Sequence, residues 1–118
     1  MQTDSLEQLR RRLAGFARQR DWEQFHSPKN LSMALIAEAA ELVEHFQWLS
    51  EDESCNLAAD KKAEVRLELA DILIYLIRTA DRLNVDLIQA AHDKIALNER
   101  RYPPDRVRGQ AKRAEEYK

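Results

Sequence analysis

The sequence contains few residues that break helices or form tight turns. Two of its 118 residues are glycine and three are proline, well below the roughly one in eight that is usual in globular proteins. A β-sandwich or β-barrel needs a turn every ~8–12 residues, which so few turn formers cannot supply. Gly15 and Gly109 stand far apart, so no glycine-rich loop can bind phosphates through backbone N–H groups. These shortages predict an all-α fold.

Three further shortages narrow the class of protein. The single cysteine, Cys55, excludes an intramolecular disulfide framework and is typical of a reducing compartment. The 19 Lys and Arg residues nearly balance 21 Asp and Glu residues, which argues against non-specific nucleic-acid binding. The longest apolar run, residues 72–77, is far shorter than the ~20 residues that span a bilayer, and the N-terminus lacks a signal-peptide pattern. We therefore expect a cytoplasmic protein with no nucleic-acid or membrane partner.

The apolar pattern predicts four helices with short connections, which is typical of a bundle of antiparallel neighbours. The expected helices cover residues 5–20, 28–49, 61–83 and 86–102. Ser5 with Gln8 forms a capping box, Pro28 follows an N-cap serine, and Asp86 caps the last helix. The acidic segment 50–60 is predicted to be a mobile loop. We expect one domain over residues 1–104 and a polar tail over residues 105–118.

The third predicted helix is apolar on nearly every side over residues 72–77. A surface helix in a small monomer would show a polar face there. This pattern predicts that the helix is also buried against another subunit.

Carboxylates interrupt the apolar runs of the second and third predicted helices. Glu38 and Glu41 share a face about 80° wide with His45 and Trp48. The other helix has a face about 60° wide, made up of Glu64, Glu68, Asp71 and Tyr75. Each helix therefore carries an acid pair at i, i+3 spacing, with an aromatic residue one or two turns further on.

Two opposed acidic faces predict a site for a hard divalent cation. Unpaired carboxylates are costly to bury unless they are protonated, paired or bound to a cation. A site with oxygen ligands alone favours Mg²⁺ or Mn²⁺ over Zn²⁺. The alternative is that the acids face solvent and pair with Lys61, Lys62 or Arg66. A di-iron site needs Glu-x-x-His from two helices, and that spacing occurs only at Glu23 and His26, in a predicted connection.

The fourth predicted helix carries residues of the opposite charge. Lys94, Asn98 and Arg101 fall within about 40° of one another, and Tyr102 follows. These side chains could form salt bridges with the acids, or bind phosphate oxygens beside a metal ion. Among the aromatic residues, Trp22, Trp48 and Tyr75 could stack on a nucleobase or simply belong to the core.

Several short segments of the chain, taken in order, resemble the MazG-like, all-α nucleoside triphosphate pyrophosphohydrolases, and most closely their dCTP pyrophosphatase branch. The resemblance runs over about residues 5–105. The segments that carry it are RDWEQFH at 20–26, Pro28-x-Asn30-Leu31, Glu38-x-x-Glu41-Leu42, Phe46-Gln47-Trp48, Glu68-Leu69-x-Asp71-x-Leu73-x-Tyr75-Leu76 and Lys94-x3-Asn98-x2-Arg101-Tyr102-Pro103.

The resemblance implies a homodimer or homotetramer that hydrolyses a nucleoside triphosphate to the monophosphate and pyrophosphate with Mg²⁺. The substrate it implies is dCTP or a related pyrimidine or modified deoxynucleotide. By position, the metal ligands and catalytic residues would be Glu38, Glu41, Glu68 and Asp71, with one glutamate orienting the attacking water. Lys94, Asn98, Arg101 and Tyr102 would bind phosphates and sugar. Trp22, Trp48 and Tyr75, together with His26 and Asn30, would line the base pocket.

Two departures from the family pattern bear on metal number and base choice. Many MazG-like sequences have a further Glu directly before the first ligand, where this chain has Ala37. The vertebrate dCTP enzymes carry a His in the first helix at the position of Leu13. A different interpretation of the whole chain is a non-catalytic helical module that dimerises through its third helix.

Overall fold

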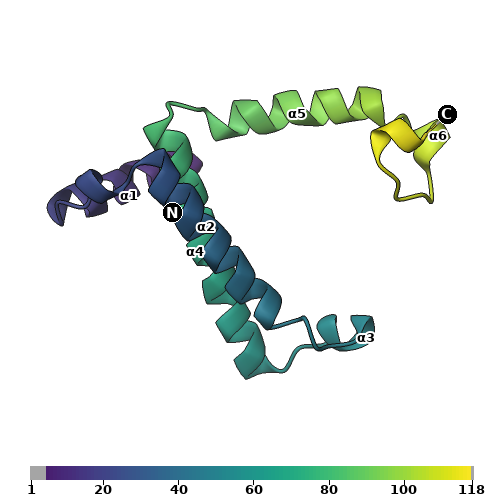
Figure 1. The fold of residues 1–118 in the computed structure, drawn as a ribbon, viewed down its shortest axis with the longest axis horizontal. Helices are drawn as coiled ribbons and strands as arrows, with labels where there is room; N and C mark the ends of the chain where they lie inside the picture. The colour runs from purple at the N-terminus through teal and green to yellow at the C-terminus, as the bar shows by residue number, and fades with distance from the viewer. Residues whose placement is uncertain (1–4, 118) are drawn as a thin grey trace. The chain divides into compact units, whose positions relative to one another are not determined.

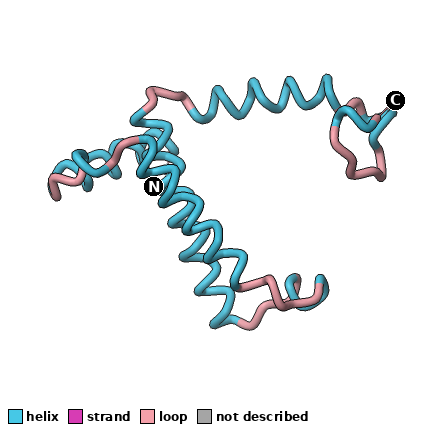
Figure 2. Tube along the Cα trace, viewed as in Figure 1, coloured by secondary structure: helices cyan, strands magenta, loops and turns pink. Residues whose placement is uncertain are grey.

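The computed structural model describes residues 5–117, and every regular element in that range is helical (Figures 1 and 2). The elements are α1 (Leu6–Gln19), η1 (Glu23–Phe25), α2 (Pro28–Glu44), α3 (Glu51–Ser54), α4 (Ala59–Arg82), α5 (Leu87–Arg101), α6 (Pro104–Val107) and η2 (Ala114–Glu116). The predicted all-α class is confirmed. No helix of the described residues is long and apolar enough to cross a bilayer.

The chain divides into two compact units, Met1–Val85 and Asp86–Lys118. Helices α1 to α4 belong to the first unit, and α5, α6 and η2 to the second. The two short helices α6 and η2 lie in or beside the segment predicted as a polar tail. The functional residues on α2 and α4 can therefore be described within one unit.

Three of the four predicted helix starts are confirmed by their caps, whereas α4 starts at Ala59, two residues before the predicted start, without a side-chain cap. The Ser5 hydroxyl accepts a bond from the backbone N–H of Gln8, and the Gln8 side chain accepts one from the backbone of Ser5. Ser27 caps α2 ahead of Pro28, and Asp86 caps α5. Each cap satisfies a backbone N–H group that has no partner inside its helix.

Two helices end without glycine. Asp21 after α1 and Asn84 after α4 have φ values of 54° and 55°, the left-handed conformation that usually favours glycine. The backbone N–H of Trp22 donates to Ala17 O at 2.9 Å, and that of Val85 donates to Ala80 O at 2.8 Å. These bonds form Schellman motifs, in which Asp and Asn take the place that glycine usually fills.

The second helix is shorter than predicted, and the loop after it contains a helical turn. Helix α2 ends at Glu44 instead of residue 49, and mostly i→i−3 bonds follow it: Phe46 N–H donates to Val43 O at 2.9 Å. In the predicted loop, Ser50 and Glu53 form a capping box that starts α3. That local pair explains why four residues of an acidic segment are helical.

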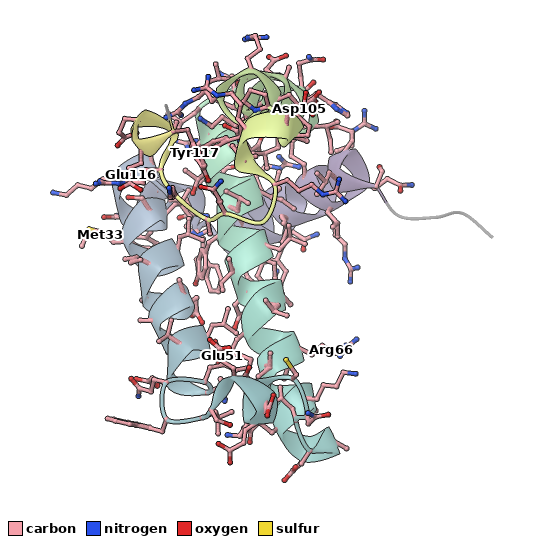
Figure 3. The ribbon with its side chains drawn as sticks, turned by 90° about the vertical axis from the view of Figure 1, so that its right-hand side faces the viewer. Met33, Glu51, Arg66, Asp105, Glu116 and Tyr117 are labelled. Atoms are coloured by element: carbon pink, nitrogen blue, oxygen red, sulfur yellow. The ribbon has the colours of Figure 1, made fainter. Side chains whose placement is uncertain are left out.

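Helices α2 and α4 lie side by side, and α1 also packs against α4 (Figures 1 and 3). Few side chains are fully enclosed in this unit; Ala17, Leu31, Val65, Ile77 and Ala80 form its buried core. Many larger apolar residues are exposed, including Met33, which projects outward from α2 in Figure 3. The long α2–α4 contact is the framework for the acidic residues.

Candidate metal-binding site

Three carboxylates from two helices meet between α2 and α4. Glu38 and Glu41 come from α2, Glu68 comes from α4, and each offers one oxygen within 4.8 Å of the others. The i, i+3 spacing places the two α2 residues on one face, and the packing of α4 against that face brings up the third. The sequence-based expectation that the two acidic faces oppose each other agrees with this cluster.

The cluster contains acceptor oxygens that have no hydrogen-bond donor. Oε2 of Glu38 and Oε2 of Glu68 are both buried without a partner. Burial and the adjacent Glu41 carboxyl raise the pKa of Glu38 to about 7. Burial and Glu41 also raise the pKa of Glu68. Neighbouring carboxylates can bond to one another only by holding a proton between them, so the metal-free cluster tends to retain protons.

This donor set fits a hard divalent cation. It offers carboxylate oxygens alone, from three side chains, with two of those oxygens lacking any other partner. Mg²⁺ and Mn²⁺ favour oxygen ligands, and a cation would remove both the repulsion and the unsatisfied acceptors.

Asp71 lies near the cluster without joining it. Its charge contributes to raising the pKa of both Glu38 and Glu68, which places it within electrostatic reach. It is not among the residues whose oxygens converge within 4.8 Å. The structure thus brings together three of the four predicted ligands, with the fourth one helical turn along α4.

Glu64 was predicted to share the acidic face of its helix with Glu68 and Asp71, but its carboxylate has other partners. Its carboxylate pairs with Lys61 Nζ at 3.2 Å and lies 3.8 Å from Nδ1 of His45. The Lys61 Nζ also lies 3.4 Å from that ring nitrogen. For Glu64, pairing with a surface lysine is therefore the correct alternative.

The predicted base-pocket residues fall into separate environments. The Trp22 ring meets the edge of Phe16 at 5.7 Å between centroids and lies 6.3 Å from His26. Tyr75 is half-buried on α4, whereas Trp48 is 88% exposed in the turn beyond α2. Because α2 ends at Glu44, Trp48 lies outside the helix and does not share a helical face with Glu38 and Glu41.

Asn30 has a local structural role. Its side chain donates to the backbone oxygen of Phe25 at 3.0 Å, and its backbone N–H donates to the Ser27 hydroxyl at 3.1 Å. Both bonds hold the connection between η1 and α2, so the side-chain amide is already engaged.

The predicted phosphate- and sugar-binding residues lie in the second unit. Lys94 and Arg101 are exposed on α5, and Asn98 is half-buried. The Arg101 guanidinium lies 5.7 Å from the Tyr102 ring centroid, and Tyr102 meets the edge of Tyr117 at 6.0 Å. Their role toward substrate stays a prediction.

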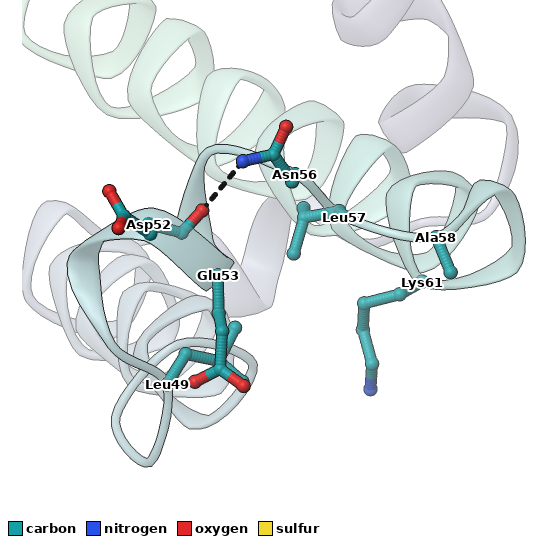
Figure 4. Close-up of a pocket in the computed structure, with 7 residues that line it drawn as sticks. All are labelled: Leu49, Asp52, Glu53, Asn56, Leu57, Ala58 and Lys61. Carbon is teal, nitrogen blue, oxygen red and sulfur yellow. Dashed lines mark hydrogen bonds between the residues drawn. The ribbon is translucent and has the colours of Figure 1, made fainter.

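A hollow of about 480 Å³ lies beside α3 (Figure 4). One hydrogen bond spans its edge, from the Asn56 side chain to Asp52 O at 2.9 Å. Its lining residues are Leu49, Asp52, Glu53, Asn56, Leu57, Ala58 and Lys61. None of the three clustered glutamates lines this hollow, so it is separate from the candidate metal site.

Residues that the sequence did not single out also lie next to Trp22 and His26. Phe16 contacts Trp22 and has the Arg20 guanidinium 3.5 Å above its ring. Arg78 is buried and bonds to His26. The available signal for Arg78 was a charged residue directly after the apolar run 72–77, comparable to the carboxylates that interrupt the other runs.

Comparison with known proteins identifies similar sequences and a similar fold. The MazG-like family model matches residues 34–117. A crystal structure of a pyrophosphatase from Archaeoglobus fulgidus superposes with a TM-score of 0.80 and 39% identity, covering 87% of this chain and 96% of that one.

Mammalian relatives are similar over nearly the whole chain. Mouse dCTP pyrophosphatase 1 is 48% identical over 109 residues, and human dCTP pyrophosphatase 1 is 43% identical over 111 residues. These alignments cover 91% and 92% of this chain but 64% and 65% of those proteins. The chain therefore spans less than two thirds of the length of these relatives. The family match across both acidic helices, together with the archaeal likeness, shows that the chain belongs to the MazG-like family.

Proposed function

We propose that this chain is a Mg²⁺-dependent nucleoside triphosphate pyrophosphohydrolase. The observation that carries the proposal is the cluster of Glu38, Glu41 and Glu68, with two buried carboxylate oxygens that lack donors. Such a cluster is costly in a folded protein unless it binds a cation. These residues would hold a cation that, when bound, would supply charge neutralisation for the phosphates and a lower pKa for water.

The proposed reaction cleaves the bond between the α- and β-phosphates. The oxygen of water attacks the α-phosphorus, the anhydride P–O bond breaks, and pyrophosphate leaves from a nucleoside monophosphate. Glu38, Glu41 and Glu68, with Asp71 one helical turn away, would hold the metal, and one glutamate would accept the proton of the attacking water. Mn²⁺ is expected to substitute, since it prefers the same ligands.

The proposed substrate is dCTP or a related pyrimidine or modified deoxynucleotide, in a role that removes such nucleotides from the pool. The names of the mouse and human relatives support this choice. We propose that Lys94, Asn98, Arg101 and Tyr102 bind the phosphates and sugar. The proposed base pocket contains Trp22, Trp48 and Tyr75, with His26 and Asn30. We expect Leu13 to make the base preference of this chain differ from that of its relatives. We expect Ala37 to change the number of metal ions bound.

We further propose that the protein is a cytoplasmic homodimer or homotetramer. Leu69, Leu73 and Leu76 on α4 are 52%, 39% and 40% exposed in the single chain. Leu69 and Leu73 also line a hollow of about 860 Å³. Exposed apolar area of this kind is typical of a surface that pairs with another chain.

A panel of canonical and modified nucleoside triphosphates, with Mg²⁺ and then with excess chelator, tests the proposal. Equal release of monophosphate and pyrophosphate, lost with chelator, is the expected result. Orthophosphate without pyrophosphate would contradict the proposed bond cleavage. If a folded protein turned over no nucleotide, the non-catalytic helical module would be favoured instead.

A further inference from the structure

Among residues 5–117, one charged residue is buried: Arg78, with only 4% of its surface exposed. Its NH1 group donates to Oδ2 of Asp81 at 3.1 Å. The other oxygen of Asp81 accepts a bond from NH1 of Arg10 on α1 at 3.0 Å. Asp81 thus ties two guanidinium groups together at the α1–α4 contact and fixes the plane of Arg78.

The same guanidinium makes a second bond toward the η1 segment. Its Nε–H donates to Nδ1 of His26 at 3.4 Å. A ring nitrogen accepts a hydrogen bond only when it carries no proton, so this bond requires neutral His26 with its hydrogen on Nε2. Burial, Arg78 and Arg82 all lower the pKa of His26, and only Glu23 raises it. The charges around the ring therefore favour the same neutral state as the hydrogen bond.

His26 in turn lies against Trp22. Their ring centroids are 6.3 Å apart with an interplanar angle of 60°. The Trp22 ring also contacts Phe16, with centroids 5.7 Å apart and an interplanar angle of 67°. A chain of direct contacts thus leads from the buried guanidinium through His26 to Trp22.

We propose that Arg78 is a positioning residue that fixes the tautomer of His26 and, through it, the position of the Trp22 ring. The functional consequence rests on the proposed function, in which His26 and Trp22 contact the nucleotide. A lysine cannot replace Arg78, because bonding to Asp81 and His26 together requires donors held at a fixed angle. His26 then offers a ligand one donor, at Nε2, and no acceptor.

Nitrogen NMR of the His26 side chain tests the tautomer without reference to catalysis. In the wild-type protein at neutral pH, we expect Nε2 to carry the hydrogen and Nδ1 to carry none. In Arg78→Lys we expect a mixture of tautomers and a shifted indole resonance of Trp22. Arg82→Gln is the matched control, because it removes a nearby positive charge and leaves the hydrogen bond; its tautomer should be unchanged. A wild-type Nδ1–H tautomer, or a charged ring, would overturn the proposal.

Steady-state kinetics with the best nucleotide of the panel test the positioning role. We expect Arg78→Lys to raise KM by roughly tenfold and to change kcat by less than about twofold. Arg82→Gln is again the control variant, because its His26 tautomer and Trp22 indole resonance should be the same as in the wild-type protein. A merely structural role would lower the folded fraction and kcat and leave KM unchanged, which would overturn the proposal.

His26→Asn covers the case in which Arg78→Lys does not fold. An asparagine oxygen can accept from Arg78 in place of Nδ1, but the variant has no ring against Trp22. We expect a folded protein with a raised KM and a shifted Trp22 resonance; an unchanged KM and resonance would contradict the proposal. If the wild-type protein turned over no nucleotide, the proposed function would fail, and the tautomer measurement would still decide the role of Arg78 toward His26.

Discussion

Glu38 on α2 and Glu68 on α4 each bury one carboxylate oxygen that meets no donor, on opposite sides of the same helix–helix contact. Two helices that pack side by side would be more stable with apolar residues at these positions. Keeping two acids there costs stability in the absence of a cation. Metal binding at this cluster should therefore stabilise the folded protein.

Glu38→Gln is expected to lower kcat/KM by at least ~100-fold, since even the partners of metal ligands cost roughly 10–100-fold when they are removed. The same change should raise the melting temperature in chelator, because it removes one charge from the cluster. Glu44→Gln is the control, since Glu44 is an exposed acid on the same helix. Wild-type activity in folded Glu38→Gln would falsify the assignment of Glu38 as a ligand.

The metal-free protein should lose stability as pH rises. The folded-state pKa of Glu38 is raised from 4.5 to about 7, so the folded state binds this proton more tightly than the unfolded state. The stabilising contribution is complete below about pH 4.5 and is lost as pH rises through about 7. The raised pKa of Glu68 acts in the same direction.

Denaturant unfolding in chelator over this pH range measures the effect, and Glu38→Gln should show a flatter profile than the wild type. Mg²⁺ competes with the protons, so its stabilising effect should be greater above pH 7 than below pH 5. Equal stabilisation by Mg²⁺ at both ends would contradict the assignment of the cluster as a metal site.

Asp71→Asn is expected to abolish turnover while the protein stays folded. Asp71 lies outside the converging oxygens and still raises the pKa of Glu38 and Glu68 through its charge, so removing the charge should lower both pKa values. Activity assays and a melting curve separate the two effects. Retained wild-type turnover would limit the metal ligands to the three glutamates.

Asp81→Asn is expected to destabilise the protein by about 3 kcal/mol, because it leaves the buried Arg78 without its carboxylate partner. The side chain of Arg78 is 5% exposed and that of Asp81 is 21% exposed. Asp52→Asn, at an exposed position on α3, serves as the control. Chemical denaturation measures both, and equal stability of the two variants would contradict this role of Asp81.

Leu73→Gln and Leu76→Gln should weaken or abolish self-association, because both side chains are partly exposed on α4 in the single chain. Leu83→Gln is the comparison, as Leu83 is 54% exposed at the end of the same helix. Light scattering at micromolar concentration measures the mass. A monomeric wild-type protein would contradict the proposed homo-oligomer.

Local patterns explain why so much of the fold could be predicted. Ser5 with Gln8, Ser27 with Pro28, and Asp86 each act within one helical turn, so the helix starts follow from neighbouring residues. The end of α2 was not predictable in this way. The residues after Glu44 are compatible with a helix, and the change to i→i−3 bonds depends on the structure that follows.

The sequence by itself determined the helical class and the two acidic faces, because glycine shortage, capping and i, i+3 spacing are properties of neighbouring residues. Asp21 and Asn84 end their helices where glycine is lacking, in a conformation that few other residues adopt at low cost. Only the tertiary structure decided that Glu41 joins Glu38 and Glu68 while Glu64 pairs with Lys61, and that Arg78 bonds to His26. Those outcomes depend on how one helix is rotated against the next and on which rotamers the contact allows, and helical spacing alone does not contain that information.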